Sequence, residues 1–404
     1  MYNFGLWYHL ILHRENLSTL KIKRTLKRFL KYLKRMIISL ILLITALVAA
    51  YLLFVTFYPS FGGDVTKERQ LHYANSLQFE NGKFVNTNRV NMDLGFSETL
   101  SLARKFFFTK VENGRPKQDI QVTKIDSSAI ANYNSPTRFV WFGHSSFLLQ
   151  MNHKNILFDP MFSAVPAPHS LLGANRFSSE LPIEVKKLPK IDAVLISHDH
   201  YDHLDYESIQ LLKDRVVMFY TPLGVGAHLE AWGVSKDNIV EMDWWQESTF
   251  DDLTFVNTPA RHFSGRKLTN RQSTLWSSWV IQSDTENIFF SGDSGYDAHF
   301  KAIGAKYGPF DFAMMECGQY NKMWPDIHMF PEETAQAGVD LQAKKIMPIH
   351  WGAFKLAMHS WTDPVERVTI KANELNLPVI TPKIGEAFLL EDAVINHQDW
   401  WQDK

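Results

Sequence analysis

The chain has 404 residues, of which 45% are hydrophobic and 21% are charged. This composition is that of a globular protein, and it excludes intrinsic disorder, collagen and a small disulfide-linked scaffold. The formal net charge is −1, but residues 1–35 carry nine of the 42 basic residues and one of the 43 acidic residues. The remaining chain therefore has a net charge of −9, which argues against nucleic acid as a partner.

A membrane span is predicted near the N-terminus. Residues 36–58 form an uncharged run of 23 residues, long enough as a helix to cross about 30 Å of hydrocarbon. A buried core helix is disfavoured because apolar residues occupy every helical face. Eight of the basic residues crowd residues 21–35, directly before the span. The positive-inside rule then predicts a single-pass anchor with residues 1–35 in the cytoplasm and the rest outside it, which is the periplasm if the source is a Gram-negative bacterium.

Two alternatives bear on this topology. Cleavage as a signal peptide is disfavoured, because the apolar run is longer than an ordinary signal core and no small-x-small site follows it. Initiation at Met36 would remove the basic segment and with it the basis for the orientation. The single cysteine, Cys317, excludes an intramolecular disulfide and leaves the compartment open; we expect it to be buried.

The rest of the chain divides into three parts. Residues 59–136 are polar and irregular and are expected to be a linker and an N-terminal extension that wraps the next domain. Residues 137–392 form the predicted catalytic domain, and residues 393–404 form a tail. Strands are expected at residues 138–143, 146–151, 155–159, 192–197, 215–220, 253–259, 278–282, 287–292, 310–316 and 345–350. Helices are expected at residues 206–213, 224–232, 297–305, 331–343 and 364–376.

A dense cluster of histidine and aspartate follows the apolar run 192–197. Residues 198–203 read His-Asp-His-Tyr-Asp-His, and imidazole with carboxylate suits zinc, with iron or manganese as lesser possibilities. His198 and His200 can share one ion, and Asp202 and His203 can serve a second ion. A solvated polar turn is disfavoured, because such groups are costly to bury without a cation. His262, Asp293 and His350 end other apolar runs and are further candidates.

These residues resemble the metallo-β-lactamase superfamily, whose ordered pattern His-x-His-x-Asp-His, then His, Asp and His, appears over residues 138–391. Motifs such as FGHSSF, ISHDHYDHLD, SGDSGY and HWGAF are most similar to N-acylphosphatidylethanolamine-hydrolysing phospholipase D. The resemblance implies a four-layer αβ/βα sandwich with two zinc ions at one edge. It implies His198, His200 and His262 on one ion, with Asp202, His203 and His350 on the other. Asp293 would bridge both ions.

The same resemblance implies roles for further residues. Asp202 and His328 are placed in the catalytic set, with His328 as proton donor or oxyanion stabiliser. His144 and Asp159 are expected to orient metal ligands. Asp199 points away from its neighbouring histidines and is expected to hold the loop or a ligand imidazole. Arg266 is expected either to contact a phosphate or to be an ordinary exposed arginine.

The predicted reaction is hydrolysis of a phospholipid phosphodiester of the N-acylphosphatidylethanolamine type. Penicillin hydrolysis is disfavoured, because β-lactamases of the best-known subclass carry arginine at the position of His203 and a thiolate at that of Asp293. Hydrolysis of a lactone or another carboxylic ester is one alternative, and a non-catalytic metal-binding scaffold is another. The tryptophan pairs 244–245 and 400–401 are expected mainly in the core, with a membrane-facing pair as the alternative.

Overall fold

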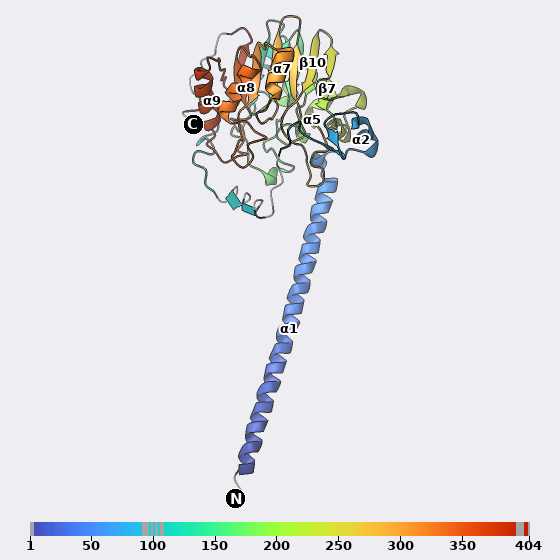
Figure 1. Ribbon diagram of the computed structural model, residues 1–404, viewed down its shortest axis with the longest axis vertical. Coiled ribbons are helices and arrows are strands. Elements are labelled where there is room, and N and C mark those ends of the chain that lie inside the picture. The colour runs from blue at the N-terminus through green and yellow to red at the C-terminus, as the bar shows by residue number, and fades with distance from the viewer. Residues whose placement is uncertain are drawn as a thin grey trace. The chain divides into compact units, whose positions relative to one another are not determined.

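The computed structural model describes residues 4–90, 97, 100–101, 104–105, 109–392 and 400–402. The predicted tail, residues 393–404, lies outside the described residues except for residues 400–402. The chain forms two compact units, Met1–Tyr58 and Pro59–Lys404 (Figure 1).

The first unit is one helix, α1 (Phe4–Phe57), of 54 residues. Its part from Lys21 to Phe57 is long and apolar enough to cross a membrane, with a mean hydropathy of 2.8 in its most apolar stretch. The sequence predicted the apolar helix but did not predict that the basic segment continues it. Lysine and arginine are good helix formers, so the change in polarity does not end the helix. The helix ends just before Pro59, which disfavours helical backbone at the residue preceding it.

The second unit contains two large mixed sheets. The seven-stranded sheet has the order β15-β3-β4-β5-β6-β7-β8, and the six-stranded sheet has the order β14-β13-β12-β11-β10-β9. The strands of the seven-stranded sheet are β3 (Arg138–Trp141), β4 (Phe147–Met151), β5 (Lys154–Phe158), β6 (Ile191–Leu195), β7 (Val216–Pro222), β8 (Ile239–Met242) and β15 (Ala387–Leu389). The strands of the six-stranded sheet are β9 (Glu247–Phe250), β10 (Leu253–Thr258), β11 (Ser278–Gln282), β12 (Asn287–Phe290), β13 (Phe312–Glu316) and β14 (Ile346–Ile349).

Both faces of each sheet are apolar, which explains the continuous hydrophobic runs in the sequence. In β3, Phe139 faces the core between the sheets, whereas Val140 faces a second core outside the seven-stranded sheet. In β12, Phe290 faces the central core and Phe289 faces a third core outside the six-stranded sheet. Side chains of successive strand residues point to opposite faces, so each strand supplies two cores. The result is a four-layer sandwich, as predicted.

Helices cover the outer face of each sheet. The helices α5 (Tyr206–Leu212) and α6 (Gly226–Ala231) contribute to the core outside the seven-stranded sheet. The helices α7 (His299–Tyr307), α8 (Pro331–Asp340) and α9 (Asp363–Glu374) lie side by side outside the six-stranded sheet (Figure 1). Pro331 and Pro364 occupy first turns, where the missing amide proton costs no hydrogen bond. All ten predicted strands and all five predicted helices are confirmed.

The described part of residues 59–136 packs against the sandwich. It contains a 3₁₀ turn (Pro59–Phe61), α2 (Lys67–Tyr73), the hairpin of β1 (Phe79–Glu80) and β2 (Lys83–Phe84), and α4 (Ser127–Ala131). Phe61, Tyr73 and Phe84 are buried. The Arg69 guanidinium pairs with Glu230 of α6 and lies 3.0 Å from Glu241 of β8. The extension therefore contributes to the fold of the second unit.

The tryptophan pairs lie mainly in the interior. Trp400 and Trp401 are only 8% and 4% exposed and pack against Trp351, so a membrane-facing role for this pair is wrong. Trp244 is buried, and Trp245 is 36% exposed. The C-terminal pair faces inward because it completes the central hydrophobic core.

Strand direction determines where the site forms. β3 is antiparallel to β4, and β4 is antiparallel to β5, so β3 runs parallel to β5 and β6. By the same reasoning β10 runs parallel to β12, β13 and β14. The loops after the strands of each set therefore lie at one edge of their sheet.

Candidate metal centre

The seven predicted ligands come from loops at these carboxyl-terminal edges. The histidine-aspartate segment follows β6, and His262, Asp293 and His350 follow β10, β12 and β14. The structure brings these donor atoms, with His144, into two groups of four, each with all donor atoms within 4.8 Å of one another, and a third group at the same spacing joins His328 to Asp293 and His350. One group of four is His198, His200, His262 and Asp293, and the other is His144, Asp202, His203 and His350.

The first group converges on His200. Its Nδ1 lies 2.9 Å from Nε2 of His198 and 3.2 Å from Nε2 of His262. Asp293 Oδ2 lies 3.8 Å from Nε2 of both His198 and His262. Three imidazoles and one carboxylate therefore surround a common point.

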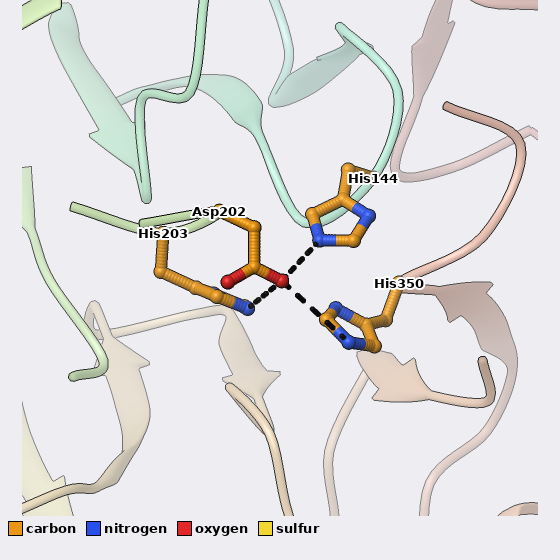
Figure 2. Close-up of side chains that lie close together, drawn as sticks. All are labelled: His144, Asp202, His203 and His350. Carbon is orange, nitrogen blue, oxygen red and sulfur yellow. Dashed lines mark hydrogen bonds and ion pairs between the residues drawn. The ribbon is translucent and has the colours of Figure 1, made fainter. Parts of the chain in front are cut away.

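The second group converges on Asp202, as Figure 2 shows. Its Oδ2 lies 2.9 Å from Nε2 of His144, 3.5 Å from Nε2 of His203 and 3.9 Å from Nε2 of His350. Asp293 reaches this group as well, because its Oδ2 lies 3.1 Å from Nε2 of His203. The Asp293 carboxylate thus faces both groups of donor atoms.

This arrangement fits divalent metal ions. Tetrahedral ligands about 2.0–2.1 Å from zinc lie roughly 3.3 Å from one another, and the donor atoms named above are separated by 2.9–3.9 Å. Two buried atoms at the junction, Nε2 of His203 and Oδ1 of Asp293, form no hydrogen bond of acceptable geometry and have only ion-pair contacts, the shortest at 3.1 and 3.2 Å. Buried polar atoms without partners are costly, and a shared cation would satisfy both.

Three histidines are held by hydrogen bonds at the ring nitrogen that faces away from the centre. Nδ1 of His198 lies 2.9 Å from Ser197 Oγ, and Nδ1 of His262 lies 2.9 Å from the Ile327 carbonyl. Nδ1 of His203 lies 2.7 Å from Asp159, a fully buried carboxylate. An imidazole that donates from Nδ1 presents the Nε2 lone pair, so these contacts prepare each ring for a metal.

Asp159 links two parts of the ligand loop. Besides His203, it accepts hydrogen bonds from the backbone amide and the hydroxyl of Ser197, at 2.7 and 2.6 Å. Asp159 and His144 both have left-handed backbone, with φ of 37° and 54°, a conformation that non-glycine residues adopt at a cost. Asp159 thus lies where it can orient His203. His144 contacts Asp202 directly and belongs to the second group of donor atoms.

The protein groups alone create strong mutual fields. Burial would raise the pKa of Asp202, but His203 and His144 hold it well below its usual value. Burial would lower the pKa of His203, but Asp293, Asp202 and Asp159 raise it well above its usual value. Burial and the neighbouring histidines together hold the pKa of His198 well below its usual value. The carboxylates are therefore ionised and His198 is neutral, which are the forms that bind metal, whereas the His203 ring holds a proton that a bound cation would displace.

Asp199 lies behind the ligands, as its alternation with His198 and His200 predicts. One carboxylate oxygen accepts the amide of Gly265 at 2.7 Å, and the other lies 3.3 Å from Nε2 of His228. His228 is fully buried. Sequence reasoning did not single out His228, because it lies within α6 and does not directly follow an apolar strand.

Arg266 is not an exposed arginine, and that alternative is wrong. It is 3% exposed, and its guanidinium donates to the carbonyls of Ser60, Asp199 and Leu204. These bonds join the ligand loop to the start of the second unit. Arg266 therefore supports the ligand loop, because its guanidinium donates to backbone oxygens of that loop.

His328 lies beside both groups, and its partner is a residue that the sequence analysis missed. The His328 ring centroid lies 5.1 Å from that of His262 and 5.3 Å from that of His350. Its Nδ1 lies 3.2 Å from Oε1 of Glu316, which is fully buried at the end of β13. The other Glu316 oxygen accepts the Met329 amide at 2.9 Å. The sequence pattern could have identified Glu316, because it ends an apolar strand. Asp293 and His350, which were predicted, follow apolar strands in the same way.

Comparison with known proteins places the chain in a family. Residues 154–351 match the model of the β-lactamase superfamily domain. The chain is 39% identical over 336 residues to the protein Rv0906 of Mycobacterium tuberculosis, covering 81% of this chain and 88% of that protein. It is 32% identical over 247 residues to the mitochondrial N-acyl-phosphatidylethanolamine-hydrolyzing phospholipase D of Saccharomyces cerevisiae, covering 59% of this chain and 52% of that protein.

The fold is also similar to that of a solved structure. A possible metal-dependent hydrolase from Veillonella parvula superposes with a TM-score of 0.52 at 16% identity, over 63% of this chain and all of that chain. At this identity the similarity concerns the fold alone. Together with the family match and the donor groups described above, it leads to one conclusion: the chain belongs to the metallo-β-lactamase superfamily of metal-dependent hydrolases.

Proposed function

We propose that this chain is a membrane-anchored binuclear zinc hydrolase that cleaves a phosphodiester of an N-acylphosphatidylethanolamine-like phospholipid. The products would be phosphatidic acid and an N-acylethanolamine. The observation that carries the proposal is the position of Asp293, whose carboxylate faces both groups of donor atoms. Relatives named as phospholipases of this specificity support the choice of substrate class.

His198, His200 and His262 would hold one ion, and Asp202, His203 and His350 the other, with Asp293 between them. Two bound zinc ions would supply a hydroxide nucleophile and neutralise charge on the phosphate. His144 either adds a ligand to the second ion or orients Asp202 from 2.9 Å. Asp159 and Asp199 hold the ligand loop, and Arg266 supports it through the Asp199 carbonyl.

His328 would donate the proton to the leaving oxygen. As water oxygen bonds to phosphorus, the bond to the ethanolamine oxygen breaks, and that oxygen takes the proton from His328. Glu316 positions the ring by accepting from Nδ1, so that Nε2 is the atom left to act. Burial would lower the pKa of His328, but the hydrogen bond and charge of Glu316 raise it above its usual value. A raised pKa favours the protonated form that a general acid needs.

The anchor is part of the proposal. The apolar run 36–58 within α1 would span the bilayer, with residues 1–35 in the cytoplasm and the metal centre on the other side. The basic residues would fix this orientation. Protease treatment of spheroplasts that express the full chain is the direct measurement: cleavage of the second unit supports an outward-facing domain, and full protection contradicts it.

The test of activity uses the full chain in detergent, with metal content measured on the same sample. We expect two zinc ions per chain and release of phosphatidic acid from N-acylphosphatidylethanolamine. Two zinc ions with hydrolysis of lactones but not of the phosphodiester would establish the carboxylic-ester alternative. Bound metal with no turnover of either substrate would favour the scaffold alternative, and a chain without metal would contradict the mechanism.

A further inference from the structure

Among the exposed leucines of the second unit, Leu171, Leu172 and Leu268 lie on two loops that meet the same short segment. Leu171 is 86% exposed, Leu172 is 60% exposed and Leu268 is 79% exposed. A single exposed leucine is ordinary on a protein surface. These three are notable because both of their loops bind the same short segment, residues 60–64.

The contacts of that segment are specific. The hydroxyl of Ser60 donates to the carbonyl of Pro168 at 2.7 Å, and the 3₁₀ turn Ser170–Leu172 follows directly. The carbonyl of Ser60 accepts two bonds from the Arg266 guanidinium, at 2.8 and 2.6 Å. Lys267 forms an ion pair with Asp64 at 2.8 Å. Both leucine-bearing loops therefore meet where the chain enters the second unit.

That entry point is covalently tied to the candidate membrane span. The apolar run ends at Tyr58, and Pro59 is the first residue of the second unit. Ser60 is thus two residues beyond the run, whatever angle the helix adopts. Side chains grouped around Ser60 would lie close to the membrane surface on the side where the run ends.

The charge of the loops suits lipid headgroups. Residues 168–173 and 264–272 contain no acidic residue. Of the basic side chains in the second loop, Arg266 is buried, Lys267 pairs with Asp64, and Arg271 is exposed. The chain beyond residue 35 otherwise has an excess of acidic residues. Exposed leucines on loops without acidic residues, with the exposed Arg271 on the second loop, have the character that favours an interfacial position.

The second loop also touches the metal centre. The Tyr201 hydroxyl donates to the carbonyl of Arg266 at 2.6 Å, within the histidine-aspartate segment. The ring of Phe263 lies 4.4 Å from that of His200, which is only partly buried. A membrane at Leu268 would therefore adjoin the loop that lines the candidate site.

We propose that Leu171, Leu172 and Leu268 insert into the bilayer interface and form a lipid-docking surface beside the metal centre. The proposal rests on the proposed membrane anchor but not on phosphodiester cleavage. It places the metal centre where a substrate with long acyl chains could reach it without leaving the membrane.

Single-cysteine labelling of the full chain tests this surface. The native Cys317 is buried, and burial raises the pKa of its thiol, so it resists labelling. Leu171→Cys and Leu268→Cys would carry an environment-sensitive fluorophore in vesicles of phosphatidylethanolamine and phosphatidylglycerol. The matched control is Ile370→Cys, which is 62% exposed on α9, a helix that packs on α8 and β14. Circular dichroism would verify that each variant is folded.

We expect blue-shifted emission at positions 171 and 268 and about twofold or greater quenching by nitroxide-labelled lipids, with neither effect at position 370. Flotation of the same vesicles reports on the anchor separately. Protein that floats but shows water-like emission at 171 and 268 would overturn the docking surface and leave the anchor intact. Protein that does not float would overturn the anchor, and the docking surface with it.

Discussion

The buried carboxylate of Glu316 lies 3.2 Å from Nδ1 of His328, one strand away from the loop that carries His350. Burial raises the pKa of Glu316, and the hydrogen bond and charge of His328 oppose that rise and favour the carboxylate. A carboxylate in this position has one evident use, which is to fix the tautomer and direction of the His328 ring. The pair can be tested apart from the metal ligands.

We predict that Glu316→Gln slows hydrolysis of phosphodiesters with an alkyl leaving group by about tenfold or more, and that His328→Ala slows it by about 10²-fold or more. A p-nitrophenyl leaving group needs no proton, so both variants should lose much less activity on such a substrate. The double variant should be no slower than His328→Ala. Glu374→Gln, at an exposed position, is the control. Equal losses on both substrates would contradict proton donation.

Asp159 is predicted to support metal binding through His203. Asp159→Asn keeps the size of the side chain but weakens the acceptor for the His203 Nδ1 proton. We expect metal affinity to fall about 10- to 100-fold, as is usual when the partner of a ligand histidine is lost. Competition with a chromogenic chelator measures this change. The control is Asp214→Asn, which is exposed; equal affinities for the two variants would show that Asp159 has no such role.

The sandwich and the metal ligands could be predicted because both follow from short-range patterns. Apolar runs such as residues 287–290 predict strands, and residues that end such runs collect at one edge of a sheet. The strands β8, β9 and β15 were missed: residues 239–242 and 247–250 are partly exposed, so their hydrophobic pattern is weak.

Residues whose role depends on a distant partner could not be predicted. His228 is within a helix and becomes important only because Asp199 packs against it. Arg266 was expected at a phosphate or at the surface. Its actual acceptors are the backbone carbonyl oxygens of residues 60, 199 and 204, and no sequence pattern identifies such acceptors. By contrast, the pattern of residues 198–203 was informative, because several metal ligands stand next to one another in the sequence there.

His299 is predicted to make stability depend on pH. Burial lowers its pKa to about 3, well below the value of about 6.5 expected in the unfolded chain. Between these values the unfolded state binds more protons, so stability decreases as the pH falls from 6.5 towards 3. The loss at pH 5 is about 2 kcal/mol for this one group.

His299→Gln should remove that part of the pH dependence while preserving a donor for Ser294, which lies 3.2 Å from Nε2. Urea unfolding of the metal-free protein at pH 7 and pH 5 gives the two free energies of unfolding. Their difference should be smaller by about 2 kcal/mol in the variant. His72→Gln, at an exposed position on α2, should behave as the parent does. An unchanged difference in His299→Gln would show that the fold does not lower the pKa of His299.

Metal removal is predicted to lower both activity and stability. Without a cation, the donor atoms of two ligand groups remain buried at 2.9–3.9 Å from one another, and several polar atoms lack partners. A ligand that binds only the folded state stabilises it in proportion to the logarithm of its concentration over Kd. We expect a chelator to abolish hydrolysis and lower Tm by about 5 °C or more, and zinc to restore both. Asp293→Asn should lower the zinc content and remove most of the zinc-dependent rise in Tm, because Asp293 faces both groups of donor atoms. The control is Asp284→Asn, at an exposed position, which should keep the full rise in Tm. A Tm insensitive to chelator and zinc in the parent chain would contradict a structural contribution from these sites.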